Sequence, residues 1–318
     1  MKSFTIKEND KNQRLDKFLQ KAVPRLPKTL MYKYIRLKRI KVNGKKSDIS
    51  YKLCLGDQLE LYINDEFFEE SSNKDFLLVP SNINVLYEDN NILLVDKKAG
   101  LVVHEDNENT IDTLINRALH YLYDKKEYNP DVEASFVPAL CNRLDRNTSG
   151  IVIIAKNAES LRVLNEKIKE RKITKLYLCV VSGHLEKKQD TLTHYHFKNQ
   201  ADNTVKVFDK PNKNTKTMIT AYKVLEYSKE NTLVEVDLKT GRTHQIRAHM
   251  AYIGHPLIGD GKYGSNKTNM KYGQKQQLLY SYKLKFESDI NETVLSYLDG
   301  KEFEVKQIWF RDEFKDKF

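Results

Sequence analysis

The first 60 residues carry hydrophobic side chains first at helical spacing and then at strand spacing. Positions at i, i+3, i+4 and i+7 predict one face of an amphipathic helix: Leu15, Phe18, Leu19 and Ala22. After a proline-containing break at residues 24–27, Thr29 is expected to cap a second helix. The alternation at residues 40–42 runs into Asn43-Gly44, a dipeptide typical of tight β-turns. This pattern predicts a small module of helices and strands.

From residue 85 onward, short apolar runs outnumber helical stripes. Strands are predicted at residues 85–87, 92–95, 151–154, 176–181, 233–238 and 280–286. Helical spacing is clear over residues 111–122 and 161–168. Because these elements do not alternate regularly, the sequence predicts an α+β fold with a mixed, largely antiparallel sheet. It disfavours a doubly wound parallel sheet.

A polar and acidic segment at residues 64–82 separates the two regions and lacks hydrophobic periodicity. Such a segment is expected to be a linker. The predicted domains are therefore residues 1–63 and residues 83–318.

Charge is divided along the chain in a similar way. Residues 1–60 hold 16 basic and 6 acidic side chains, whereas residues 61–140 hold 6 basic and 16 acidic ones. The rest of the chain holds 32 basic and 22 acidic side chains, and the overall net charge is +10. Two basic blocks separated by an acidic one suggest two surfaces that contact the same polyanion.

Other features of the composition argue against several classes of protein. No stretch approaches the ~20 apolar residues of a membrane span, and the N-terminus lacks the apolar run of a signal peptide. The three cysteines, Cys54, Cys141 and Cys179, are odd in number and widely spaced, which is typical of a reducing compartment. We therefore expect a cytoplasmic protein without membrane contact.

Asp145 lies between Arg143 and Arg146, in a polar stretch directly before a predicted strand. Nearby positive charge favours the ionised carboxylate and lowers its pKa. Thr148 and Ser149 can bond to the local backbone and fix this loop. The spacing alone leaves two interpretations open, a reactive carboxylate or a surface turn with ion pairs.

A second polar cluster follows the predicted strand at residues 233–238. Gly241 is expected to turn the chain into a helix capped by Thr243. His244 and Arg247 would then share a face near the start of that helix, a position that favours an anion. An amphipathic helix with solvated basic side chains fits the same pattern.

Two possible cofactor signals are weak. Residues 259–264 read G-x-G-x-x-G, but a dinucleotide site needs a strand before this motif and a helix after it. Here a helix is expected before the motif and a polar loop after it. The eight histidines show no spacing typical of metal ligands, and His244 and His249 are five residues apart rather than four. We expect neither a metal nor a nucleotide cofactor.

Four segments, in order along the chain, resemble the RluA-type pseudouridine synthases. Residues 142–156, NRLDRNTSGIVIIAK, resemble the catalytic motif of that family, and residues 85–104 resemble its first strands. Residues 175–183, KLYLCVVSG, resemble its tyrosine motif, and residues 241–260 resemble its third motif. The resemblance covers about residues 85–290, and the ordered set is far more specific than any one segment. It implies a catalytic domain with a central active-site cleft.

The N-terminal block resembles a small RNA-binding domain first known from a ribosomal protein of the small subunit. The matching features are Arg14-Leu15-Asp16, Val42-Asn43-Gly44 and Gly56-Asp57. This combination of domains is common in enzymes that act on the large ribosomal subunit. The resemblance therefore implies 23S ribosomal RNA as the substrate, with transfer RNA as an alternative.

The chain departs from the family pattern at one position and contains one longer segment. The family usually has histidine before Arg-Leu-Asp, where this chain has Asn142. Asparagine donates and accepts hydrogen bonds but does not titrate near neutral pH, which argues against an acid–base role at this position. Residues 122–137 form a longer excursion before the motif, with no function evident from the sequence.

The resemblance implies the chemistry and three catalytic residues. The reaction breaks the bond between uracil N1 and the ribose, turns the base and rejoins it through C5. Asp145 is implied as the nucleophile, or as the base that removes a ribose proton, and the sequence does not choose between these roles. Arg247 is implied to pair with Asp145. Tyr177 is implied to stack on the uracil and to move a proton at C5.

The resemblance also implies that the target uridine is flipped out of its stack, which costs a few kcal/mol. Arg143 is implied to enter the vacated space, and Arg146 to hold the RNA backbone. Arg242 and His244 are expected to make further RNA contacts. In the N-terminal block, we expect a basic group to dock RNA: Lys33, Arg36, Lys38 and Arg39.

The sequence thus predicts an RNA pseudouridine synthase that works without a cofactor. We expect a monomer because one chain carries every motif. Two other classes stay open at this point. One is a non-catalytic RNA-binding or ribosome-assembly factor, and the other is a nucleotide-cofactor enzyme that uses residues 259–264.

Overall fold

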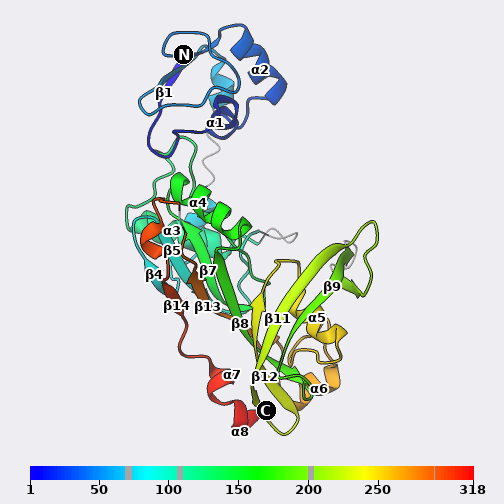
Figure 1. Ribbon diagram of the computed structural model, residues 1–318. Helices are drawn as coiled ribbons and strands as arrows, with labels where there is room; N and C mark the ends of the chain where they lie inside the picture. Colours follow the sequence, from blue (N-terminus) through cyan, green and yellow to red (C-terminus); the bar gives the residue numbers. More distant parts are fainter. Residues whose placement is uncertain (69–73, 106–109, 200–203, 290) are drawn as a thin grey trace.

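The computed structural model describes residues 1–68, 74–105, 110–199, 204–289 and 291–318. Figure 1 shows a small unit that contains the N-terminus and a larger unit built around one long, twisted sheet. The buried side chains of the small unit form a cluster of their own, and those of the larger unit form four further clusters. Each unit therefore has its own hydrophobic core.

The N-terminal unit is a three-stranded antiparallel sheet with two helices. Its elements are β1 (Lys2–Thr5), α1 (Leu15–Ala22), α2 (Lys28–Arg36), β2 (Ile40–Val42) and β3 (Gln58–Leu61), and the strand order is β1-β3-β2. The helix face predicted for α1 is confirmed, because Leu15, Phe18 and Leu19 are fully buried. The sequence pattern missed β1, a short strand in which only Phe4 packs against the core.

The predicted cap of the second helix is wrong. α2 begins at Lys28, and Pro27 occupies the N-cap position, so Thr29 already lies inside the first turn. Proline suits the start of a helix because its φ is fixed and it has no N–H to leave unpaired. Lys38 and Arg39 lie beyond the end of α2 rather than on it, and Lys38 has a left-handed φ of 61°.

The acidic segment at residues 64–82 begins and ends in short 3₁₀ helices, η1 (Asp65–Phe68) and η2 (Asp75–Leu78). The phenylalanines of η1 pack against the N-terminal core. Phe76 of η2 is 3% exposed and packs in the larger unit. Each described end of the segment is therefore attached to a core.

The larger unit contains an eleven-stranded sheet in the order β10-β9-β11-β12-β8-β13-β7-β5-β4, with β14 beside β13 and β6 beside β7. The strands are β4 (Val85–Glu88), β5 (Ile92–Lys97), β6 (Ala139–Leu140), β7 (Ser149–Ala155), β8 (Ile173–Ser182), β9 (Gln189–Asn199), β10 (Thr204–Phe208), β11 (Lys216–Tyr227), β12 (Asn231–Leu238), β13 (Leu279–Phe286) and β14 (Glu302–Glu304). β13 pairs with β7 in parallel, and the other pairs among the described strands are antiparallel. The predicted α+β fold with a largely antiparallel sheet is confirmed.

Two helices cover opposite faces of one half of the sheet: α3 (Leu114–Asp124) and α4 (Ala158–Lys169). Alternate residues of β5 and β7 join two different clusters, one containing Leu164 of α4 and the other Leu114 of α3. Burial on both faces explains why these strands read as continuous apolar runs. α3 begins after the cap Thr113, so the predicted helix started too early: Ile111 lies before α3 and is 41% exposed.

The other half of the sheet is also covered on both faces. α5 (Gln245–Tyr252) packs on one face, and the C-terminal helices α7 (Trp309–Asp312) and α8 (Phe314–Lys317) pack on the other. Along β8, Tyr177 joins the cluster of α5, whereas Leu178 joins that of the C-terminal helices. The alternation of β8 therefore turns Tyr177 toward α5. The remaining helices are α6 (Asn266–Lys271) and η3 (Ser296–Leu298).

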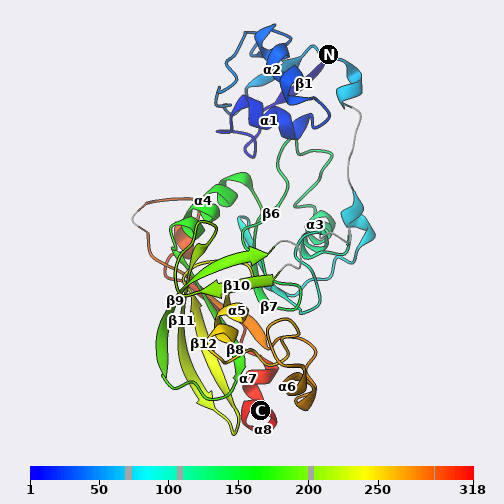
Figure 2. The same cartoon turned by 90° about the vertical axis from the view of Figure 1, so that its right-hand side faces the viewer.

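The sequence pattern missed β9, β10 and β11, which form a long antiparallel arm at the side of the sheet (Figures 1 and 2). In β9 only His196 is buried, and most other side chains are partly or fully exposed. The strand therefore lacks the apolar alternation on which the prediction depended.

Candidate active site

Seven side chains predicted to act in the larger unit line one open cleft with a volume of about 1170 Å³. They are Arg143, Asp145, Arg146, Tyr177, Arg242, His244 and Arg247. The loop before β7, strand β8 and the start of α5 supply these residues, although they are far apart in the sequence. The four basic residues predicted in the N-terminal unit are exposed there and do not line this cleft: Lys33, Arg36, Lys38 and Arg39.

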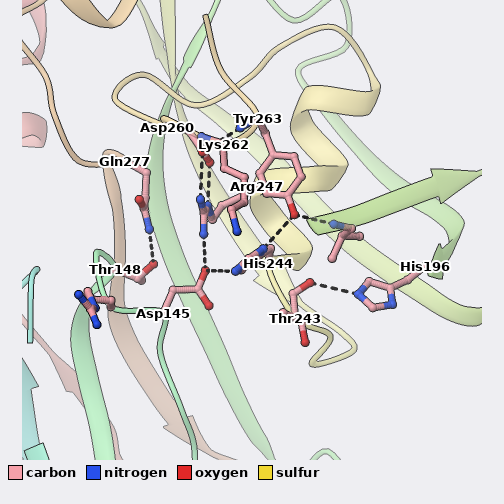
Figure 3. Close-up of polar contacts among 12 residues, drawn as sticks. Asp145, Thr148, His196, Thr243, His244, Arg247, Asp260, Lys262, Tyr263 and Gln277 are labelled. Carbon is pink, nitrogen blue, oxygen red and sulfur yellow. Dashed lines mark hydrogen bonds and ion pairs between the residues drawn. The ribbon is translucent and has the colours of Figure 1, made fainter. Parts of the chain in front are cut away.

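Asp145 lines the cleft from a tight turn in which the N–H of Thr148 donates to its carbonyl at 3.0 Å. Its carboxylate Oδ2 accepts a hydrogen bond from Nη1 of Arg247 at 2.9 Å (Figure 3). The carboxylate side chain is 29% exposed and thus open to a ligand in the cleft. A guanidinium 102 residues away in the sequence therefore contacts this carboxylate.

Arg247 is itself held by Asp260, a residue for which no role was predicted. Nε and Nη2 of Arg247 donate to the two carboxylate oxygens of Asp260 at 2.7 and 3.0 Å. Asp260 is fully buried, and Arg247 is 7% exposed. The two-pronged contact fixes the plane of the guanidinium and leaves Nη1 to point at Asp145.

The charges of this buried pair stabilise each other. Burial by itself raises the pKa of Asp260, but the hydrogen bonds and charge of Arg247, with the N–H groups of Lys262 and Tyr263, bring it below its ordinary value. Burial by itself lowers the pKa of Arg247, and the two carboxylates bring it above its ordinary value. Both groups are therefore charged at neutral pH.

The predicted helix cap at this site is wrong. α5 begins at Gln245, and His244 occupies the N-cap position with a left-handed φ of 49°. Thr243 caps nothing with its side chain; its carbonyl lies 3.2 Å from Nε2 of His196. The side chain of Gln245 fixes the turn instead, because its Oε1 accepts from the N–H of Arg242 at 3.0 Å. This unusual backbone turns His244 into the cleft.

His244 lies between Tyr263 and Asp145. The Tyr263 hydroxyl accepts from the N–H of Val205 at 2.8 Å and lies 2.9 Å from Nδ1 of His244. Burial lowers the pKa of His244 to about 4, so the ring is neutral at pH 7. Tyr263 then donates its proton to Nδ1, which leaves the N–H on Nε2, 4.0 Å from Asp145 Oδ2. The ring of Tyr263 also lies 5.3 Å from the Arg247 guanidinium.

Tyr177 forms part of the apolar wall of the cleft. The side chain is 5% exposed and packs in the same cluster as Ile246 and Leu279, which also line the cleft. Burial raises the pKa of Tyr177 to about 12, so its phenol stays protonated at neutral pH. A flat, neutral ring at the edge of a basic cleft is suited to contact with a nucleobase.

The turn that carries Asp145 is held from behind by Lys97, another residue that the sequence analysis did not single out. Its Nζ donates to the carbonyls of Lys98, Leu101 and Arg146 at 3.1, 2.8 and 2.9 Å. Lys97 is 1% exposed, and burial lowers its pKa to about 8. Three carbonyl acceptors around one buried ammonium fix the position of the Asp145 turn.

Gly150 holds the same turn against β13. Its φ is 120°, and a Cβ at this position would lie 2.2 Å from the carbonyl oxygen of Ser281. Gly150 pairs with Ser281 where β7 and β13 run in parallel. Only glycine permits this close approach of the two backbones.

Asn142, which departs from the family pattern, is bonded to the backbone of β7. Its Oδ1 accepts from the N–H of Ile153 at 2.7 Å, and its Nδ2 donates to the carbonyl of Ile151 at 3.2 Å. Both ends of the amide are thus used to connect the motif to the strand.

Further basic side chains line the cleft that contains Asp145. Besides the predicted arginines, the lining contains Lys169, Arg171, Lys175, Lys198, Lys239 and Lys262. These residues come from the end of α4 and the turn after it, from β8 and β9, from the turn after β12 and from the loop after α5. A cleft with this distribution of charge is suited to an extended polyanion rather than a small neutral molecule.

The G-x-G-x-x-G motif does not form a dinucleotide site. It lies after helix α5 and not after a strand. The polar loop predicted after the motif is wrong, because Ser265 caps α6 there. Its first glycine, Gly259, packs so closely that a Cβ would lie 2.0 Å from the carbonyl oxygen of Gln276. The turn presents Asp260 to Arg247, so this motif serves the site already described.

The described residues contain neither a cluster of metal-ligating side chains nor a membrane-spanning helix. No group of three or more His, Cys, Asp or Glu side chains among them is arranged to hold a metal ion. None of the helices in that part of the chain has the length and hydrophobicity needed to cross a bilayer.

An arginine-bound carboxylate in a long basic cleft, beside a neutral aromatic wall, places this protein among enzymes that act on a nucleic acid. Comparison with known proteins then identifies the family. Residues 91–252 match the family described as RNA pseudouridylate synthase, and residues 13–59 match the S4 domain. The chain belongs to the RluA family of RNA pseudouridine synthases, which are isomerases, and binds RNA through its N-terminal S4 domain.

Individual relatives agree with this assignment. The uncharacterised RNA pseudouridine synthase YlyB of Bacillus subtilis is 33% identical over 83% of this chain and 84% of its own length. The ribosomal large subunit pseudouridine synthase C of Buchnera aphidicola subsp. Schizaphis graminum is 32% identical over 86% and 84%. The structure of human RNA pseudouridylate synthase domain containing 1 covers 73% of this chain and 93% of its own, with 24% identity and a TM-score of 0.53, and so shares the fold.

Proposed function

We propose that this enzyme converts specific uridines of large-subunit ribosomal RNA to pseudouridine, with Asp145, Tyr177 and Arg247 as its catalytic residues. The observation that carries the assignment of the site is the 2.9 Å contact between Arg247 and Asp145, with Arg247 fixed by buried Asp260. Relatives named as ribosomal large subunit pseudouridine synthases support the choice of RNA.

Asp145 is the reactive group in this proposal. Its carboxylate attacks the uridine covalently or removes the 2′ proton of the ribose, and the N1 glycosidic bond breaks. The uracil then turns and C5 bonds to C1′. C5 gives up its proton and N1 takes one up from solvent, while the bond to Asp145 breaks or the 2′ proton returns, so that the product is an isomer of the substrate. Arg247 orients the carboxylate and contributes a fixed positive charge in a cleft that the base closes when it enters.

Tyr177 stacks on the uracil in this proposal, because its ring belongs to the apolar wall next to Asp145. Its raised pKa keeps the hydroxyl protonated, so it is positioned to donate or relay a proton rather than to act as a phenolate. Tyr177→Phe keeps the ring and removes the hydroxyl, whereas Tyr177→Leu removes both. We expect conversion to fall more in the leucine variant.

The basic residues along the cleft hold the RNA while the base is out of its stack. Arg143 and Arg146 flank Asp145 on the same turn, which supports a role in the vacated space and at the adjoining phosphates. Arg242 and His244 line the same cleft from the turn before α5. Charge contacts of this kind offset the few kcal/mol needed to flip a base.

We further propose that residues 1–63 dock the RNA, that residues 64–82 link the domains and that residues 83–318 carry out the reaction. Lys33, Arg36, Lys38 and Arg39 are exposed at and just after the end of α2, which supports a docking surface outside the cleft. One chain supplies every proposed catalytic residue, which supports a monomeric enzyme.

The decisive experiment maps pseudouridine at single-nucleotide resolution in total RNA from cells with and without this protein. The proposal expects a missing site in large-subunit ribosomal RNA, restored by the wild-type protein but not by Asp145→Asn. A missing site only in transfer RNA would correct the substrate. No missing site, or full rescue by Asp145→Asn, would refute the catalytic proposal and favour a non-catalytic RNA-binding role. RNA binding by purified Asp145→Asn is the control for folding.

A further inference from the structure

Residues 129–136, here named the bridging loop, lie between α3 and β6 and have no part in the site described above. They are half of the excursion at residues 122–137, for which no function is evident from the sequence. Figure 2 shows the chain between α3 and β6 rising from the larger unit to the N-terminal domain. The loop is therefore a second connection between the two domains, besides the linker.

The bridging loop is anchored in both hydrophobic cores. Tyr128, immediately before it, is 7% exposed and belongs to the cluster that contains α3. Ala134, near its far end, packs against the core of the N-terminal domain. Inside the loop, the N–H groups of Val132 and Glu133 both donate to the carbonyl of Asn129 at 3.1 Å. The loop is thus a folded segment with a defined shape.

Ser135 forms the centre of the contact. Its hydroxyl donates to Oδ1 of Asp10 at 2.6 Å and accepts from Nε2 of Gln13 at 2.8 Å. Asp10 is fully buried, and its second oxygen accepts from the N–H of Lys7 at 3.3 Å. The same carboxylate therefore shapes the turn of the N-terminal domain and binds the loop.

Asn9 makes two contacts with the larger unit. Its Nδ2 donates to the carboxylate of Glu133 at 3.2 and 3.3 Å. Its Oδ1 accepts from the N–H of Ala158, the first residue of α4, at 3.1 Å. One amide therefore connects the N-terminal domain to both the loop and the helix.

The loop also contacts residues on either side of this centre. Lys7 Nζ donates to the carbonyl of Val132 at 3.2 Å. Lys74 of the linker pairs with Asp131 at 2.9 Å. Contacts at several separate points resist both rotation and translation of one domain against the other.

We propose that the bridging loop sets which uridines are modified, by holding the RNA-docking domain at a fixed position relative to Asp145. This inference rests on the proposed function. A domain on a free linker samples many positions and presents the active site to uridines at many distances from the docked RNA. A held domain favours uridines at one distance and reacts with them at a higher effective concentration. The loop thus acts as a positioning element and touches no reacting atom.

Asn9 and Glu133 allow a test in which one contact is broken and then restored. Asn9→Asp places a second carboxylate against Glu133 but keeps the oxygen that accepts from Ala158. Asn9→Asp combined with Glu133→Gln exchanges donor and acceptor, so the hydrogen bond returns at the wild-type net charge. Ser135→Ala removes the contacts to Asp10 and Gln13 and is an independent second variant. Glu133→Gln alone completes a double-mutant cycle, which separates the contact from the effects of each substitution.

Small-angle X-ray scattering of the full chain, without RNA, measures the arrangement of the domains. We expect the wild type and the exchanged pair to give one compact scattering curve, and Asn9→Asp and Ser135→Ala to give larger, broader distance distributions. Thermal melting of each variant reports whether both domains are folded. Identical curves for all four proteins would refute the claim that the loop holds the domain.

Kinetics on two RNA probes measure the effect on specificity. One is a transcript of the large-subunit RNA that contains the mapped uridine, and the other is a short hairpin with the same uridine. We expect Asn9→Asp and Ser135→Ala to lower kcat/KM on the long transcript by on the order of tenfold, with recovery in the exchanged pair. The rate on the hairpin should not change, and neighbouring uridines in the transcript should begin to react.

Equal losses on both probes would show a general defect and refute the specificity role. If the wild type modifies neither probe, the proposed function fails, and the scattering experiment still decides whether the loop holds the domain. The two failures are therefore distinguishable.

Discussion

Asp260 provides the sharpest test of how this active site is organised. Asp260→Asn keeps the shape of the side chain and an oxygen that can accept from the N–H groups of Lys262 and Tyr263, which lie at 2.8 and 3.0 Å. It removes the negative charge and one of the two acceptors that fix Arg247 at 2.7 and 3.0 Å. The substitution therefore changes the support of Arg247 without touching the cleft wall that contains Tyr177.

The magnitude follows from the burial of the pair. Removing one partner of a buried ion pair costs about 3–5 kcal/mol in unfolding free energy. Asp145 remains as a counter-charge for Arg247 and the backbone bonds can persist, so we expect about 2–3 kcal/mol. For a domain of this size, that loss lowers Tm by about 4–12 °C. Loss of the fixed guanidinium orientation should lower kcat about 10–100-fold, because misplacement of a catalytic group by ~1 Å is sufficient for such losses.

The assay is the release of tritium from the C5 position of uridine in the RNA, measured at a temperature where the variant is folded. RNA binding is measured separately by fluorescence anisotropy. The matched control is Asp299→Asn, because Asp299 pairs with buried Lys167 at 3.0 Å, outside the cleft, and Asp289 remains as a second counter-charge at 3.4 Å. We expect the control to lose stability and keep its kcat. If Asp260→Asn kept the wild-type kcat, or if Asp299→Asn lost as much kcat, the claim that Asp260 orients Arg247 for catalysis would be refuted.

Three further predictions concern docking, pH and packing. Replacement of Lys33, Arg36, Lys38 and Arg39 by glutamine should raise KM for structured RNA about tenfold, with little change in kcat. The slope of log Kobs against log[salt] should become smaller in magnitude by about 3. A loss of kcat alone would contradict this prediction. Burial and the neighbouring His194 lower the pKa of His249 from 6.5 to about 4, so the unfolded state takes up a proton that the folded state does not. The free energy of unfolding should therefore fall as pH is lowered from 6.5 to 4. In urea titrations at several pH values, His249→Asn should reduce the number of protons taken up on unfolding by about one. An unchanged slope of the unfolding free energy against pH would contradict the cause assigned here. Gly150→Ala should cost about 3 kcal/mol or more, because its Cβ would meet Ser281 and its φ is 120°; a urea midpoint within error of the wild type would show that β7 and β13 separate without cost.

Local patterns in the sequence predicted the elements whose apolar residues repeat regularly. α1 and α4 follow the helical spacing of their leucines, and β7 follows its unbroken apolar run. The prediction failed for β9, because an arm with few buried side chains shows no such repeat. It also misplaced the caps at Thr29 and Thr243, because proline in one case and a left-handed histidine in the other determined where the helix begins.

The sequence by itself determined the fold class, the family and the group of residues that line the cleft, because these depend on motifs that are contiguous in the chain. It did not reveal that Asp260 fixes Arg247, that Lys97 holds the Asp145 turn, or that the bridging loop contacts the N-terminal domain. Those contacts join residues that are 13 to 125 positions apart. Only the tertiary structure decided them, because hydrogen bonds and ion pairs depend on distances in space, and spacing along the chain does not specify which distant side chains will meet.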